Sequence, residues 1–185
     1  MIRIAVVGDI GSGKSYIANL SGYPVFNADY EVSKIYKTNK NCFKRLKKIL
    51  PKYFSVFPAN KIQIIKAIKG SEKNLKKITK IIHPEIRKKL SIFLKKNKKR
   101  KVVVLDIPLF LENKLNQKND FIVFVQSKKT DIIKKLNKRD NFNLKLYNQF
   151  KKIQLPLSYK KKKSNFIIKN NFTKISVKKI LKEIL

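Results

Sequence analysis

The sequence of 185 residues contains no tryptophan, one cysteine and one histidine. Because Cys42 is the only cysteine, an intramolecular disulfide and a cysteine-based zinc site are excluded. The single histidine, His83, argues against histidine metal clusters and Ser-His-Asp triads. Any catalytic chemistry must therefore rest on other residue types.

Long apolar runs are absent as well. The longest ones, at residues 4–7 and 102–111, are far shorter than the ~20 residues that a membrane-spanning helix requires. The first residues lead directly into a glycine-rich stretch, without the apolar region and cleavage site of a secretory signal. We expect a cytoplasmic protein without a membrane partner, built as one domain or as a core domain with inserted subdomains.

Acidic residues are scarce, with 11 Asp and Glu against 46 Lys and Arg, which gives a formal net charge of +35. Such an excess alone would predict a nucleic-acid partner. However, only five of the basic residues are arginine, and the abundant lysine, asparagine and isoleucine all have A/T-rich codons. Dedicated nucleic-acid readers tend to use arginine for bidentate contacts. We therefore attribute the charge to codon composition and expect no specific nucleic-acid partner.

The apolar pattern predicts alternating strands and helices. Short β-branched runs predict buried strands at residues 2–7, 25–26, 102–105, 121–125 and 166–168. Helical spacing predicts a mostly helical insertion at residues 30–99, a further helical stretch at 128–152 and a closing helix at 175–185. Strands separated by helices predict an α/β fold with a parallel sheet between helical layers, which binds ligands at the carboxyl ends of its strands.

Residues 8–15, GDIGSGKS, match the phosphate-loop pattern G-x-x-x-x-G-K-[ST] at every defined position, between a predicted strand and a predicted helix. In such a loop the backbone N–H groups point inward, Lys14 can reach the β- and γ-phosphates and Ser15 can hold Mg²⁺. The alternative, a chance glycine turn, rarely has both this spacing and these flanking elements. We expect a nucleoside triphosphate to contact the following residues: Gly11, Ser12, Gly13, Lys14, Ser15 and Tyr16.

Two aspartates follow predicted strands. Asp106 could reach the metal or its water shell beside the phosphate loop, and its alternative role is that of a helix cap or turn residue. Asp29 could accept the proton of an attacking hydroxyl, and its alternative role is the N-cap of a helix starting near Glu31. We favour the active-site role for both, and the sequence leaves open which of them is the general base.

Several further motifs follow in order along the chain. They are NAD at residues 27–29, HPEIR at 83–87, VLDIPLFLE at 104–112, KRD at 138–140, Gln154 and FIIKN at 166–170. Together with the phosphate loop, this ordered set resembles the dephospho-CoA kinase family from residue 2 to residue 185. The resemblance implies a P-loop NTPase-type three-layer fold. It also implies that ATP phosphorylates the ribose 3′-hydroxyl of dephospho-CoA, the last step of coenzyme A synthesis.

The resemblance implies a division of the chain and a set of site residues. The nucleotide-binding core would comprise residues 1–29, 101–127 and 164–185, a helical substrate-binding insertion residues 30–100, and a helical lid residues 128–163. The implied catalytic residues are Lys14, Asp29, Asp106 and Arg139, of which Arg139 also binds ATP from the lid. The implied substrate-binding residues are Asp29, His83, Arg87, Pro108 and Glu112.

Simpler interpretations exist for some of these residues. His83 with Pro84 could merely end a helix, because proline disfavours a helical predecessor. Arg87 could be a helix-surface residue. The lysine runs at residues 95–101 and 160–163 are expected to be solvated faces without a ligand.

The chain also departs from the family pattern. Asn27 replaces the first aspartate of Asp-Ala-Asp, and Lys61 and Lys135 stand where arginines are expected, which removes the rigid bidentate fork. Tyr16 occupies a position where many phosphate loops carry a second serine or threonine. Two alternatives stay open. One is another small-molecule P-loop kinase, because a fold alone does not determine the substrate, and the other is a basic nucleic-acid-binding P-loop ATPase, because of the net charge of +35. The oligomeric state is open.

Overall fold

The structure is a computed structural model that describes residues 1–138 and 142–172. Arg139 and the closing helix expected at residues 175–185 lie outside this described part. The chain divides into two compact units, one formed by Met1–Asn27 with Lys96–Leu185 and the other by Ala28–Lys95. The first unit contains the phosphate loop, and in sequence the second is inserted between two of its strands.

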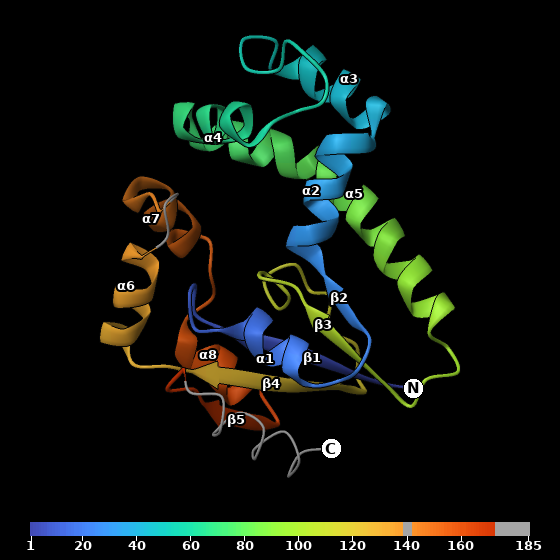
Figure 1. The fold of residues 1–185 in the computed structure, drawn as a ribbon, viewed down its shortest axis with the longest axis vertical. Helices are drawn as coiled ribbons and strands as arrows, with labels where there is room; N and C mark the ends of the chain where they lie inside the picture. Colours follow the sequence, from blue (N-terminus) through green and yellow to red (C-terminus); the bar gives the residue numbers. More distant parts are fainter. Residues whose placement is uncertain (139–141, 173–185) are drawn as a thin grey trace. The chain divides into compact units, whose positions relative to one another are not determined.

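In the described part of the chain, the first unit contains a sheet of five parallel strands in the order β2-β3-β1-β4-β5 (Figure 1). The strands are β1 (Ile2–Gly8), β2 (Val25–Asn27), β3 (Val102–Asp106), β4 (Asp120–Gln126) and β5 (Phe166–Lys169). In the central strand, Ile4 lies opposite Val104 of β3 and Phe121 of β4. All of β1 after its first residue is buried, as is typical of a parallel strand covered on both faces.

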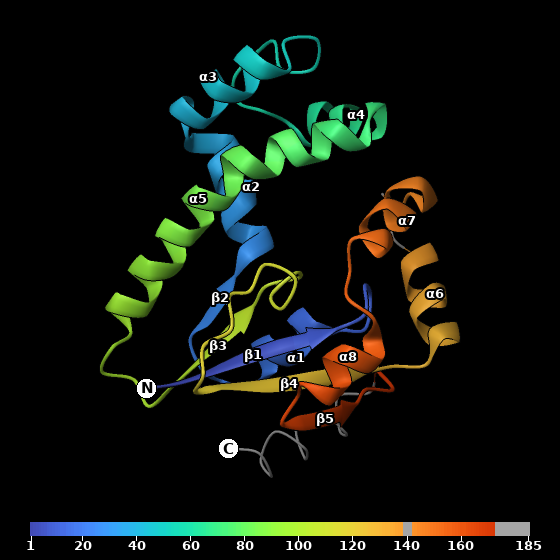
Figure 2. The same ribbon diagram turned by 180° about the vertical axis from the view of Figure 1, so that it is seen from behind.

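Helices cover both faces of this sheet. Among the described residues, the helices of the first unit are α1 (Lys14–Leu20), α6 (Lys129–Asn137), α7 (Leu144–Lys152) and α8 (Leu157–Lys162). Two opposite views show α1 in front of one face and α8 in front of the other (Figures 1 and 2). Ile17 and Ala18 of α1 pack with Ile4 and Val6 in the core. The expected three-layer α/β fold with a parallel sheet is therefore confirmed.

The second unit is helical, as expected for residues 30–99. Its helices are α2 (Ala28–Thr38), α3 (Lys40–Ile49), α4 (Lys61–Gly70) and α5 (Glu72–Lys96). Side-chain caps fix two of the helix starts. Asn39 accepts a hydrogen bond from the Cys42 N–H at 2.9 Å, and Asn60 and Gln63 form a reciprocal capping box. These asparagines explain why the helices begin where they do.

Helix α5 continues through Pro84, so the interpretation that His83 and Pro84 end a helix is wrong. Proline lacks an N–H donor and normally disrupts a helix interior. Here the apolar face of α5 is buried before and after the proline, at Ile78, Ile82 and Ile86. We infer that this packing outweighs the loss of one backbone hydrogen bond.

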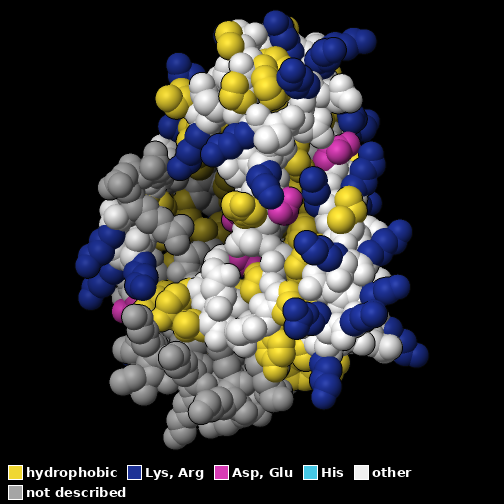
Figure 3. All heavy atoms as spheres, turned by 45° about the vertical axis from the view of Figure 1, so that its right-hand side comes forward, with side chains coloured by type: hydrophobic (Ala, Val, Ile, Leu, Met, Phe, Trp, Pro, Cys, Tyr) yellow, Lys and Arg dark blue, Asp and Glu magenta, His cyan; other side chains and the backbone are white. Residues whose placement is uncertain are grey.

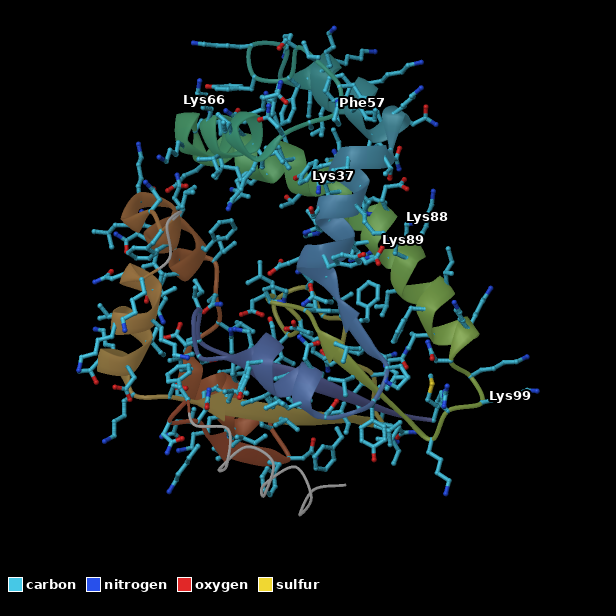
Figure 4. The ribbon with its side chains drawn as sticks, viewed as in Figure 1. Lys37, Phe57, Lys66, Lys88, Lys89 and Lys99 are labelled. Atoms are coloured by element: carbon cyan, nitrogen blue, oxygen red, sulfur yellow. The ribbon has the colours of Figure 1, made fainter. Side chains whose placement is uncertain are left out.

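Basic side chains cover much of the surface. Figure 3 shows Lys and Arg spread over the face in view, with few Asp and Glu among them. Figure 4 shows lysines projecting from the helices of the second unit, among them the exposed Lys66 of α4 and Lys88 and Lys89 of α5. None of the described helices is both long and apolar enough to cross a membrane.

Candidate functional site

The phosphate loop connects the end of β1 to the start of α1, as its sequence predicts. Gly11 and Gly13 have positive φ angles of 82° and 92°, which favour glycine over residues with a side chain. A Cβ atom at Gly11 would also come within 3.0 Å of the Ile132 Cγ2 of α6. At Gly13 it would collide with the side-chain amide of Asn170. The backbone conformation therefore favours glycine at both positions, and at Gly13 an added Cβ would also displace the Asn170 amide.

The carboxyl ends of β4 and β5 hold this loop in place. The Ser12 carbonyl accepts a hydrogen bond from the Ser127 Oγ at 3.0 Å and from the Asn170 Nδ2 at 2.9 Å. The Asn170 backbone N–H in turn donates to the Gln126 carbonyl at 2.8 Å. Sequence reasoning assigned no role to Ser127 or Asn170, because neither belongs to the phosphate-loop pattern. Both residues follow predicted strands, and Asn170 also ends the FIIKN motif that contributes to the family resemblance.

Lys14 begins α1 and turns its side chain back to the loop. Its Nζ donates to the Asp9 carbonyl at 2.7 Å and lies 3.4 Å from the Gly8 carbonyl. The ammonium group is therefore held at the loop that the sequence assigns to phosphates. Tyr16, two residues further along α1, is 36% exposed.

Asp106 ends β3 beside the phosphate loop and is only 3% exposed. In the sheet register it lies opposite Asn27, whose Nδ2 donates to the Asp106 Oδ2 at 2.7 Å. Burial raises the pKa of Asp106, while a hydrogen bond from Ser15 and the charge of Lys14 lower it. The structure thus brings together Lys14, Ser15 and Asp106, and Asn27 orients the carboxylate.

Asp29 lies in the first turn of α2, in the second unit, and its side chain is exposed. The helix already begins at Ala28, so the alternative that Asp29 is the N-cap of a helix starting near Glu31 is wrong. Both acidic residues instead occupy the first turn, where the helix dipole favours negative charge.

His83 and Arg87 lie one turn apart on α5. Burial and the neighbouring charge of Arg87 lower the pKa of His83 from its usual 6.5, so the imidazole is neutral at physiological pH. The Arg87 side chain is exposed. The pair can therefore offer a neutral hydrogen-bonding ring and an exposed guanidinium from one helix face.

Pro108 and Glu112 follow β3, and Glu112 has buried partners. Its Oε1 lies 2.6 Å from the Lys160 Nζ and accepts the Leu155 N–H at 3.0 Å. Lys160 is 1% exposed, so the expectation that the whole run at residues 160–163 is a solvated face is wrong for this lysine. Nothing in four consecutive lysines distinguishes the buried one, because the distinction comes from the tertiary position of α8 over the sheet.

The remaining expected positions are placed as follows. Lys61 begins α4 and is exposed, and the Lys135 Nζ of α6 lies 4.3 Å from the centre of the Phe172 ring. Arg139 is outside the described residues. Among residues 1–138 and 142–172, no three His, Cys, Asp or Glu side chains form a group that could hold a metal ion.

The parallel sheet and the braced loop between β1 and α1 define a P-loop NTPase-type protein. Similar folds are found in a Thermus thermophilus protein (TM-score 0.80, 24% identity, 99% of this chain and 95% of that one) and in the Campylobacter jejuni dephospho-CoA kinase (TM-score 0.65, 22% identity, 98% and 94%). A shikimate kinase from Acinetobacter baumannii is more distant, with a TM-score of 0.52 and 12% identity over 100% of this chain and 90% of that one. At these identities the likeness concerns the fold.

Sequence comparison identifies the family. The family model for dephospho-CoA kinase matches residues 2–175. Dephospho-CoA kinases of Wolbachia pipientis wMel and of Wolbachia sp. subsp. Brugia malayi are 33% and 31% identical, each over 98% of this chain and 95% of the relative. The chain belongs to the dephospho-CoA kinase family, a family of kinases that use ATP, and the resemblance seen in the ordered motifs is confirmed.

Proposed function

We propose that the protein transfers the γ-phosphoryl group of ATP to the ribose 3′-hydroxyl of dephospho-CoA and so produces coenzyme A. The observation that carries this proposal is the placement of Lys14, Ser15 and Asp106 at one sheet edge, in a chain that belongs to this family along nearly its whole length. Phosphoryl transfer needs mainly positioning and charge stabilisation, and these residues supply both.

The residues at this edge fit a magnesium ion. Mg²⁺ is usually held by one or two carboxylates together with substrate phosphates and waters. The Ser15 hydroxyl and the Asp106 carboxylate, which already interact, provide such a donor set. When bound, the ion would neutralise charge on the phosphate oxygens. The buried Asp106 carboxylate would hold it or its water shell from the protein side.

The chain's own groups divide the remaining tasks. Lys14 stabilises the charge of the β- and γ-phosphates on the loop, and Arg139 of the lid adds a second positive charge. Asp29 accepts the proton of the 3′-hydroxyl as the general base. Its exposed position on α2 supports this role.

The helical insertion at residues 30–100 would bind the CoA part of the acceptor, and the lid at residues 128–163 would close over ATP and exclude water. His83 and Arg87 are proposed to contact the acceptor from α5. The lowered pKa of His83 suits hydrogen bonding by a neutral ring rather than proton transfer. Pro108 and Glu112 would border the acceptor site from the segment after β3. We further propose that the protein acts on these small molecules in the cytoplasm.

A substrate comparison tests the proposal. The purified protein is assayed with MgATP and, in turn, dephospho-CoA, adenosine, nucleoside monophosphates and shikimate, with Lys14→Ala as the inactive control. We expect the highest kcat/KM for dephospho-CoA and a product phosphorylated at the ribose 3′ position. Another acceptor that is preferred tenfold would contradict the substrate assignment. In a parallel arm, ATP turnover stimulated by nucleic acid at physiological salt would favour the nucleic-acid-dependent ATPase instead.

A further inference from the structure

Asp9 places a carboxylate inside the phosphate loop, one residue after β1 ends at Gly8. Its side chain is only 13% exposed, and its Oδ1 accepts a hydrogen bond from the Ile10 N–H at 2.7 Å. This arrangement fixes the negative charge within the loop. A triphosphate bound there would be repelled by the carboxylate, because like charges interact strongly in a partly buried site. An aspartate at this position therefore needs a compensating positive charge.

Lys151 of α7 provides that charge. Its Nζ lies 2.6 Å from both Oδ1 and Oδ2 of Asp9, and the two residues are 142 positions apart in sequence. Lys14 approaches Asp9 differently, because it donates to the backbone carbonyl rather than to the carboxylate. The ion pair with Lys151 therefore neutralises the side chain and also joins α7 to the phosphate loop.

We propose that Lys151 is a positioning residue for nucleotide binding, which keeps the phosphate loop favourable to a triphosphate by neutralising Asp9. This inference rests on the nucleotide-binding part of the proposed function and does not depend on the acceptor. The Lys151 side chain is 39% exposed, and ion pairs that reach solvent contribute little to folding stability. Its loss is therefore expected to change nucleotide affinity much more than thermal stability.

A double-mutant cycle on MgATP binding tests the inference. The dissociation constant of MgATP, without an acceptor, is measured by calorimetry for the parent, Lys151→Met, Asp9→Asn and the double variant. We expect Lys151→Met to weaken binding about tenfold, because Asp9 then carries an uncompensated charge. The double variant is expected to bind within about threefold of the parent, because the repelling charge is gone as well. In kinetic assays Lys151→Met should raise the KM for ATP with little change in kcat.

Lys145→Met is the matched control, because Lys145 is an exposed lysine of the same helix. It is expected to bind MgATP like the parent.

Two results would overturn the inference. Lys151→Met could bind MgATP as tightly as the parent, or the double variant could bind MgATP as weakly as Lys151→Met alone. If Lys151→Met does not fold, Asp9→Asn decides: binding at least as tight as the parent's supports the inference, and clearly weaker binding overturns it. If the parent does not bind MgATP, both this inference and the proposed function are wrong. If the parent binds MgATP but does not phosphorylate dephospho-CoA, only the proposed function is wrong.

Discussion

Among single residues, Asp29 has the most specific chemical assignment, the removal of a proton from the acceptor hydroxyl. The Asp29→Asn variant keeps the size of the side chain and removes its basicity. We expect kcat to fall by ~10²-fold or more, while the affinity for MgATP stays unchanged. Steady-state kinetics and nucleotide titration measure the two quantities separately. Unchanged turnover would show that Asp29 is not the general base, and Asp106 would then be the next candidate.

Asp106 allows a prediction about pH. Burial raises the pKa of Asp106 from its ordinary value of 3.8, so the native protein binds this proton more tightly than the unfolded chain does. The free energy of unfolding therefore loses a contribution as the pH rises from 3.8 through the native pKa. We expect Asp106→Asn to melt at a higher temperature than the parent at neutral pH, and this advantage to shrink as the pH falls toward 3.8.

Asp106→Asn is also expected to lose activity, because it removes a carboxylate beside the loop that binds the phosphates of ATP. We predict a fall in kcat of about tenfold or more. Melting curves and kinetics over a pH series provide both readouts. A variant that is no more stable than the parent at neutral pH would show that Asn27 and Ser15 already compensate the buried charge.

The phosphate loop could be predicted from sequence because its chemistry is local: two glycines with positive φ, a lysine and a serine within one turn. The contact between Asn27 and Asp106 could not, because it depends on β2 and β3 pairing in register across 79 positions. The sequence indicated only that both residues end strands. Arg139 stays a prediction, since it lies outside the described residues.

At the scale of elements, the buried ion pair between Glu112 and Lys160 connects the segment after β3 to α8. Lys160→Met would leave the Glu112 carboxylate buried without its cation. We expect the free energy of unfolding to fall by about 3–5 kcal/mol, as is usual when one partner of a buried pair is removed. Urea denaturation measures the change.

Two further variants make that prediction specific. Glu112→Gln combined with Lys160→Met removes both charges and keeps an acceptor for the Leu155 N–H, so it should be considerably more stable than Lys160→Met alone. Lys161→Met, at an exposed position of the same helix, should be close to the parent. Equal losses for Lys160→Met and Lys161→Met would contradict the importance of the pair.

Elements were predictable where burial leaves a simple pattern. β3 and β4 have continuous apolar runs because both of their faces are covered, and β1 has one from Ile4 onward, after the buried Arg3. The helical stretch expected at residues 128–152 is instead divided between α6 and α7. The sequence contains a signal for the start of α7, because asparagine is a common N-cap residue. Asn143 caps this helix by accepting the Leu146 N–H at 3.1 Å.

At the scale of the whole molecule, the charge of +35 is a property of the surface and not of the fold. The core of the first unit is apolar, and most lysines in the described part of the chain are exposed, with Lys160 as a buried exception. This distribution agrees with a compositional origin of the charge. A positive surface would still raise the encounter rate with ATP and with an acceptor that carries phosphates, an effect that salt screens.

The hydrogen bond from Asn170 to the Ser12 carbonyl spans 158 positions, almost the full length of the chain. Synthesis on the ribosome therefore supplies this support for the phosphate loop long after the motif itself has been translated. A fragment that ends before β5 would retain every residue of the motif and lack its support. For the same reason, the eight-residue motif is not sufficient on its own. Grafting it into another scaffold would also require the residues that follow β4 and β5, because these residues hold the loop in place.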